Sequence, residues 1–180
     1  VAQRNPLVTE VEEVLRRRPE LNLALARRFC PFREPVANDI IRTVARENAL
    51  FSIATAVPYI VPLVSLPWAV GEFASDTAVL TANQIRMAFM LAAASDRTVG
   101  YREQRAEIAS LFAGAFGWRA IARELVGKIP FGGGLIPKAS IAFAGTWVVG
   151  ASLERYYRIG YGFTPEERKQ AFQAAIEKGK

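Results

Sequence analysis

The longest feature of the hydrophobic pattern is an uncharged run of 24 residues from Asn48 to Gly71. Its length would suit a transmembrane helix, since about 20 apolar residues cross a bilayer. Three prolines interrupt the run: Pro58, Pro62 and Pro67. Each proline removes a backbone hydrogen-bond donor and clashes with the preceding turn of a helix. We therefore expect a break near Pro58–Pro62, with two short helical arms in place of one straight helix.

The length of these arms leaves three placements open for residues 48–71. An arm of about ten residues is about 15 Å long, which is half the thickness of a bilayer or the width of a small core. The segment is therefore covered by the rest of the protein, dips into one leaflet as a re-entrant hairpin, or crosses the membrane as a kinked span.

Short helices are predicted before this run. Thr9 and Glu12 form a capping box at the start of the first helix, and Pro19 ends it. A second short helix follows over residues 21–29, and Pro35 opens a third that continues into the apolar run. Cys30 lies between these two helices, and we expect it to be a small buried residue because no base is available to activate it.

Helical periodicity also dominates the rest of the chain. It predicts amphipathic helices over residues 72–95 and 101–129, a glycine-rich loop over 130–137 and an apolar helix over 139–153. A second capping box, Thr164 with Glu167, opens a polar helix that we expect to face solvent. The sequence therefore predicts an all-α fold, a compact bundle of about six to eight helices with the Pro-broken apolar hairpin at its centre.

We expect one domain, because 180 residues can bury a single core. Its parts would be the leading helices over residues 1–48, an apolar helical core over 49–160 and the polar C-terminal helix over 164–180.

Small residues recur at every fourth position on two of the predicted helices. One row consists of Ala142, Thr146 and Gly150, and the other of Ala109, Ala113 and Gly117. Such rows let two helix backbones approach closely. A glycine inside a helix costs about 1 kcal/mol relative to alanine, so its presence needs a local reason. We therefore expect Gly145 and Gly150 at close helix contacts and Gly117 facing another backbone.

The formal charge of +6 is spread along the chain. The one run of three basic residues is Arg16, Arg17 and Arg18, and aromatic residues do not alternate with bases in a stacking pattern. This distribution argues against nucleic-acid binding. The three arginines have two interpretations: they attract anionic lipid, or they complement the C-terminal dipole of the first helix.

The composition excludes several classes of enzyme. The chain has no histidine, so Ser-His-Asp triads, Cys-His pairs and histidine metal sites are absent, and one cysteine forms neither a disulfide nor a structural zinc site. The glycine-rich loop is not a P-loop, because proline and not glycine precedes Lys138. We expect no catalytic residue, no metal and no cofactor.

One polar cluster remains on the predicted helix over residues 72–95. It consists of Glu72, Asp76, Asn83, Gln84 and Arg86. Spacings of four and seven residues place the first three on one side of a helix. The cluster is either an ion or proton site, or a structural network in which Arg86, Arg42 or Arg46 pairs with the acids.

A family resemblance extends over residues 50–160. Its motifs are Pro62-Leu63-Val64, Thr81-Ala82-Asn83-Gln84-Ile85-Arg86-Met87, Gly127-Lys128-Ile129-Pro130, Lys138-Ala139-Ser140-Ile141-Ala142, Gly145-Thr146, Gly150 and Tyr156-Tyr157. In these motifs the chain resembles the YcjF-type domain of unknown function. That family's apolar helical domain often follows an Era-like or dynamin-like GTPase domain in the same chain, and some members are described as inner-membrane proteins. This chain has no GxxxxGK[ST] motif, so nucleotide chemistry would come from a separate protein, and the resemblance supplies no catalytic residue.

Two functional hypotheses follow. The first is a non-catalytic helical module that docks on a membrane surface or on a separate GTPase-type protein, with a homo-oligomer as a further assembly. It would lie at the cytoplasmic face of the inner membrane, peripheral or re-entrant, or be soluble in the cytoplasm. The second is a small ligand-binding or enzymatic bundle that uses an acidic site around Glu72 and Asp76.

Overall fold

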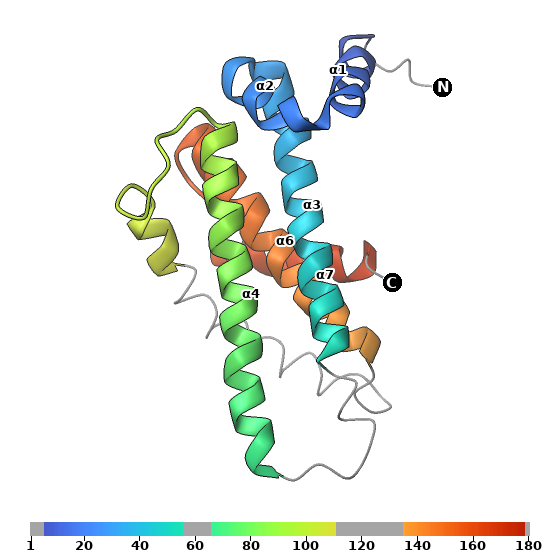
Figure 1. The fold of residues 1–180 in the computed structure, drawn as a ribbon, viewed down its shortest axis with the longest axis vertical. Coiled ribbons are helices and arrows are strands. Elements are labelled where there is room, and N and C mark those ends of the chain that lie inside the picture. Colours follow the sequence, from blue (N-terminus) through green and yellow to red (C-terminus); the bar gives the residue numbers. More distant parts are fainter. Residues whose placement is uncertain (1–5, 56–65, 111–134, 179–180) are drawn as a thin grey trace.

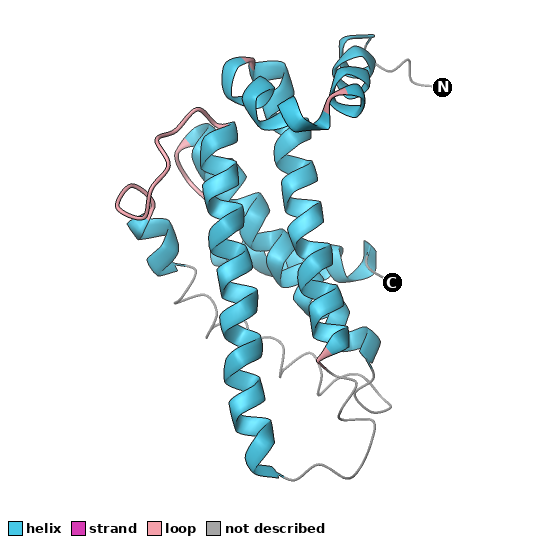
Figure 2. Ribbon diagram, viewed as in Figure 1, coloured by secondary structure: helices cyan, strands magenta, loops and turns pink. Residues whose placement is uncertain are grey.

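The computed structural model describes residues 6–55, 66–110 and 135–178, and within these ranges it contains helices and no strands (Figure 2). The helices are α1 (Pro6–Arg17), the 3₁₀ turn η1 (Pro19–Leu21), α2 (Asn22–Arg28), α3 (Cys30–Ala54), α4 (Leu66–Ala94), α6 (Leu135–Ile159) and α7 (Pro165–Lys178). Residues 105–110 are also helical. The predicted all-α fold is confirmed.

Three long helices form the centre of the molecule. α3 and α4 run side by side in opposite directions, and α6 crosses behind both in the view of Figure 1. α7 packs against α6, whereas α1, η1 and α2 lie at the end of the bundle where α3 begins (Figure 1).

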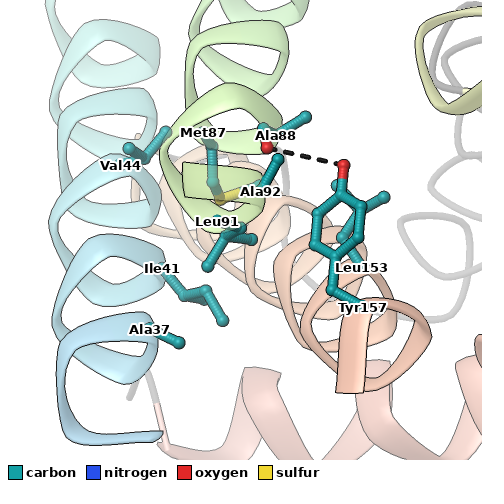
Figure 3. Packing of buried hydrophobic residues seen from close by; sticks show 9 residues of the cluster. All are labelled: Ala37, Ile41, Val44, Met87, Ala88, Leu91, Ala92, Leu153 and Tyr157. Atoms are coloured by element: carbon teal, nitrogen blue, oxygen red, sulfur yellow. Dashed lines mark hydrogen bonds between the residues drawn. The ribbon is translucent and has the colours of Figure 1, made fainter. Parts of the chain in front are cut away.

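The main hydrophobic cluster lies where α3, α4 and α6 meet (Figure 3). Its buried residues are Ala37, Ile41, Val44, Met87, Ala88, Leu91, Ala92, Leu153 and Tyr157. Four of these are alanine or valine, and such small side chains let the helices approach closely while larger residues fill the space between them. The one polar tip in the cluster, the Tyr157 hydroxyl, donates to the Ala88 carbonyl at 3.5 Å.

The polar C-terminal helix is not simply solvent-facing, as the sequence predicted. Phe172 and Ala175 of α7 are buried against Ala144 and Val148 of α6. The prediction failed because α7 carries few apolar residues, yet those few lie on one side, and Phe172 alone fills much of the contact. The capping box at the start of α7 is confirmed.

α3 begins earlier than predicted. It starts at Cys30, and Pro35 lies inside it. Proline at this position removes only the hydrogen bond to the carbonyl of Pro31 near the helix start, so the helix continues through it. Cys30 is exposed, which corrects the expectation of a buried residue. α3 also crosses the boundary predicted at residue 48 and is a central helix of the bundle.

The apolar run is divided between two long helices. Its first seven residues form the last turns of α3, which ends at Ala54, and its last residues form the start of α4 at Leu66. Pro67 is therefore a first-turn proline, where the missing N–H has no helical partner in any case. Pro58 and Pro62 lie outside the described residues, so the predicted break at these two prolines stays a prediction.

Two other helix starts differ from the sequence prediction. α6 begins at Leu135, so the last three residues of the predicted loop are helical. Residues 101–104 form a turn, and the following helix begins at residue 105. The end of α4 agrees with its prediction: Asp96 adopts a left-handed conformation at φ 57°, and the amide of Arg97 donates to the Ala92 carbonyl at 2.9 Å, which is a Schellman ending.

Candidate functional site

A buried polar network links the three central helices. Asn48 of α3 is fully buried, and its Nδ2 donates to Thr146 Oγ1 of α6 at 2.8 Å. Asn83 of α4 donates from its own Nδ2 to Asn48 Oδ1 at 2.8 Å. Within the described part of the chain, every buried side-chain nitrogen or oxygen has a hydrogen-bond partner. The three side chains of the network therefore hold one another in place.

The predicted polar cluster on α4 is only partly described. Asn83 joins the buried network, and Arg86 forms an exposed ion pair with Glu47 of α3. Gln84 is half-buried, and the side chains of Glu72 and Asp76 lie outside the described residues. The two members with known partners thus contact neighbouring residues of α3, which supports a structural role for that half of the cluster.

The predicted packing row on α6 is confirmed in part. A Cβ atom added to Gly150 would lie 2.7 Å from Ile41 Cγ1 and 2.9 Å from Met87 Sδ, so this glycine permits the close contact with α3 and α4. Thr146, one turn earlier, faces Asn48 of α3. Ala142 is half-buried at the same spacing.

Two other packing predictions have different outcomes. The prediction for Gly145 is wrong, because a Cβ atom there would meet nothing within 4 Å. Gly145 lies one residue outside the row of Ala142, Thr146 and Gly150, and one residue is a rotation of about 100° on a helix. Gly117 lies outside the described residues.

The three arginines at the end of α1 have acidic partners. Arg16 and Arg17 both pair with Glu13, the latter at 2.7 Å, and Arg18 lies 3.5 Å from Glu20. Arg16 and Arg17 occupy the last turn of α1. The side-chain hydrogen bond from Arg17 and the charge of Arg16 lower the pKa of Glu13. These pairs favour the helix-dipole interpretation over attraction to lipid.

An open groove lined by many polar side chains lies between the connection after α4 and the end of α6. Its lining includes Asp96, Arg97, Glu103, Arg105, Glu107 and Tyr156. Arg97 has a structural role in this groove. Its Nη2 donates to the Tyr157 carbonyl at 3.0 Å, and its guanidinium lies 5.2 Å from the centre of the Tyr157 ring. Burial raises the pKa of the Tyr157 hydroxyl, which stays protonated.

Metal binding and membrane crossing lack structural support in the described residues. These residues contain no group of three or more Cys, Asp or Glu that could hold a metal ion. Among the helices described, none combines the length and the apolar character that crossing a bilayer requires.

Large apolar side chains are exposed over the N-terminal helices. We call this set the N-terminal apolar surface: Leu7, Val8, Val14, Leu21, Leu23 and Phe29. They come from α1, η1, α2 and the one residue between α2 and α3, and these elements lie together at one end of the bundle (Figure 1). A contiguous apolar patch marks an interaction surface, and six exposed apolar side chains on these neighbouring helices make this end of the bundle a candidate for one. The spacing of the apolar residues over 7–29 is visible in the sequence, but it does not show which of these side chains the bundle leaves exposed.

Comparisons with protein-family models, with curated proteins and with solved structures found no match to this chain.

Proposed function

We propose that this chain is a non-catalytic helical docking module that binds a protein partner through the N-terminal apolar surface. The observation that carries the proposal is the exposure of six large apolar side chains between residues 7 and 29. The described interior offers no competing site, since its buried polar groups are all paired. A folded bundle that keeps apolar side chains in water at one end is typical of a protein that buries them against a partner.

The charges of this region favour a protein partner over a lipid surface. Residues 6–29 hold five arginines against four glutamates. Binding to anionic lipid gains about 1 kcal/mol for each basic residue near the surface, and nearby acids cancel that gain. The pairs of Glu13 with Arg16 and Arg17 leave little free positive charge in α1.

A GTPase-type protein is the partner class that we propose. Its support is the resemblance of residues 50–160 to the YcjF-type domain, which often follows a GTPase domain in one chain. The alternative function, a ligand-binding or enzymatic bundle around Glu72 and Asp76, has no described side chain to support it.

Photo-crosslinking in living cells tests the proposal. A photoreactive amino acid at Leu23, on the N-terminal apolar surface, should give a discrete adduct with a second protein, and mass spectrometry should identify a GTP-binding protein. The matched control is the same amino acid at Gln173, an exposed position on α7. Adducts with lipid alone would show that the surface binds a membrane and not a protein. Equal adducts from Leu23 and Gln173 would show that the N-terminal apolar surface is not a specific binding site.

A further inference from the structure

One side of α1 packs against the bundle, and a strip of residues next to that side is exposed. Val11 is buried, and Leu15 packs against the cluster of Ala26, Val36 and Ala94. Leu7 and Val14 lie beside this anchored side and keep 67% and 41% of their surface exposed. Seven residues separate them, which is nearly two helical turns, so they share one side of α1.

Charged residues of opposite sign lie on the same strip. Glu10 comes three residues after Leu7, and Arg17 comes three residues after Val14, so both belong to the strip by helical spacing. More widely, Glu10, Glu12 and Glu13 occupy the middle of α1, and Arg16 and Arg17 occupy its last turn. In chain order the strip is Leu7, Glu10, Val14 and Arg17, so one apolar residue, Val14, lies between the acid and the base, and Leu7 lies beyond the acid.

We infer that the strip formed by Leu7, Glu10, Val14 and Arg17 binds the same strip of a second copy of this chain, with the two α1 helices antiparallel. A two-fold contact requires a patch that is complementary to itself. A crossing between Glu13 and Val14 leaves Glu10 and Arg17 about one helical turn away on either side. The contact therefore sets Glu10 of each copy opposite Arg17 of the other, with the two Val14 side chains between these pairs and Leu7 of each copy outside them.

The charges disfavour the two competing arrangements. In a parallel pair Glu10 would face Glu10 and Arg17 would face Arg17, and like charges at an interface disfavour association. An anionic lipid surface would meet the acidic half of the strip as well as the basic half. Within one copy, Arg17 forms an exposed ion pair with Glu13 at 2.7 Å. Exposed ion pairs contribute little to stability, so Arg17 can leave Glu13 and pair with Glu10 of the second copy.

This inference goes beyond the proposed function, because it assigns Leu7 and Val14 to a second copy and leaves Leu21, Leu23 and Phe29 of the N-terminal apolar surface to the other protein partner. The test is a charge exchange in the full chain, followed by sedimentation velocity over a range of concentrations. The Glu10→Arg and Arg17→Glu variants should each weaken dimerisation about tenfold, the change expected when two symmetric ion pairs become repulsive. The double variant should restore dimerisation to within about threefold of the original chain. Lys169→Glu on the exposed part of α7 is the control and should dimerise normally.

Three outcomes would overturn the inference. The original chain could stay monomeric at every concentration, the double variant could fail to recover, or the chain could float with vesicles of phosphatidylglycerol and phosphatidylethanolamine in a manner that depends on Leu7 and Val14. Circular dichroism of each variant shows whether the helices are intact. If the chain is monomeric but a photoreactive amino acid at Leu23 still gives a protein adduct, the inferred dimer is wrong and the proposed docking function is still supported.

Discussion

Gly145 and Gly150 lie on the same helix but differ in what surrounds them. Alanine at position 145 meets open space, so Gly145→Ala should stabilise the protein by about 0.5–1 kcal/mol through helix propensity. Alanine at position 150 would press against Ile41 and Met87 in the main cluster. Overpacking of this kind costs about 1–3 kcal/mol, which outweighs the same propensity gain.

Urea unfolding of the two variants measures this contrast directly, because each serves as the control for the other. The expected result is a higher midpoint for Gly145→Ala and a lower one for Gly150→Ala. Equal shifts in the two variants would show that the close contact at Gly150 is absent in solution.

The start of α7 makes a residue-scale prediction about acid stability. Glu167 accepts a hydrogen bond from the Arg155 guanidinium at 2.8 Å, and its Oε2 accepts one from the Thr164 amide at 2.8 Å. These contacts, that of Arg155 first, lower the pKa of Glu167 from its usual 4.5. A carboxyl group with a lowered pKa in the folded state stabilises the protein above pH 4.5, and that contribution is lost as pH falls through the folded pKa.

We therefore expect Glu167→Gln to be less stable than the original chain at pH 7, with the difference shrinking as the pH falls to 3. Urea unfolding at both pH values measures it. Gln173→Ala, which changes no titratable group at an exposed position of α7, is the control and should show no such dependence on pH. A difference for Glu167→Gln that does not change with pH would refute the linkage.

Residue-level predictions succeeded where spacing alone decides the geometry. The capping box of Thr164 and Glu167 needs only two residues three apart, and the structure contains both of its hydrogen bonds. The role of Asn48 was not predictable, because its partners Asn83 and Thr146 are 35 and 98 residues away. Helical spacing shows which residues share a side of one helix, and it does not show which other helix covers that side.

At the scale of elements, the Asn48 network fixes how α3 and α6 meet. Thr146→Val removes the hydroxyl that accepts the Asn48 amide and leaves a buried donor without a partner, which should cost about 1–3 kcal/mol. Thr146→Ser keeps the hydroxyl and should cost less than about 1 kcal/mol, the loss of one methyl group.

A double-mutant cycle with Asn48→Ala and Thr146→Val separates this bond from other effects. Because both changes remove the same hydrogen bond, their costs should fall short of additivity by about 1 kcal/mol. The free energies of unfolding in urea supply the four values of the cycle. Strict additivity would mean that the two side chains do not interact in the folded protein.

The helix boundaries show where sequence reasoning about elements fails. Pro19 ends α1 as predicted, whereas Pro35 lies within α3 and Pro67 lies in the first turn of α4. Proline stops a helix only where its missing donor and its ring conflict with established turns, and near a helix start both costs are small. The residues on either side of a proline decide which case applies, and this depends on the packing of the whole helix.

At the scale of the whole molecule, the helical class follows from periodicity, but the exposed surface does not. The pattern of residues 7–29 shows amphipathic helices whose apolar side should be covered. In the structure that side is divided: Val11 and Ala26 are buried, whereas Val14 and Leu23 are exposed. How much of an apolar side the bundle covers depends on the angle at which α1 and α2 meet α3, and single-helix patterns do not contain that angle.

The division between α1 and the bundle gives the last prediction. Neither the cluster at α3, α4 and α6 nor the cluster at α6 and α7 contains a residue of α1. Among the described residues, Val11 and Leu15 are the apolar side chains of α1 that are buried or packed against a cluster. Burial of two such side chains stabilises by at most about 3–6 kcal/mol, less than most domains have in total. A chain that begins at Pro19 should therefore still unfold cooperatively in urea, with a lower midpoint, and should no longer dimerise.

Deletion of α7 is the comparison, because it uncovers Ala144 and Val148 and removes the fully buried Phe172. This deletion should lower the stability more than the deletion of α1. Loss of the cooperative transition in the chain without α1 would make that helix part of the folding core and would contradict its assignment as a docking element.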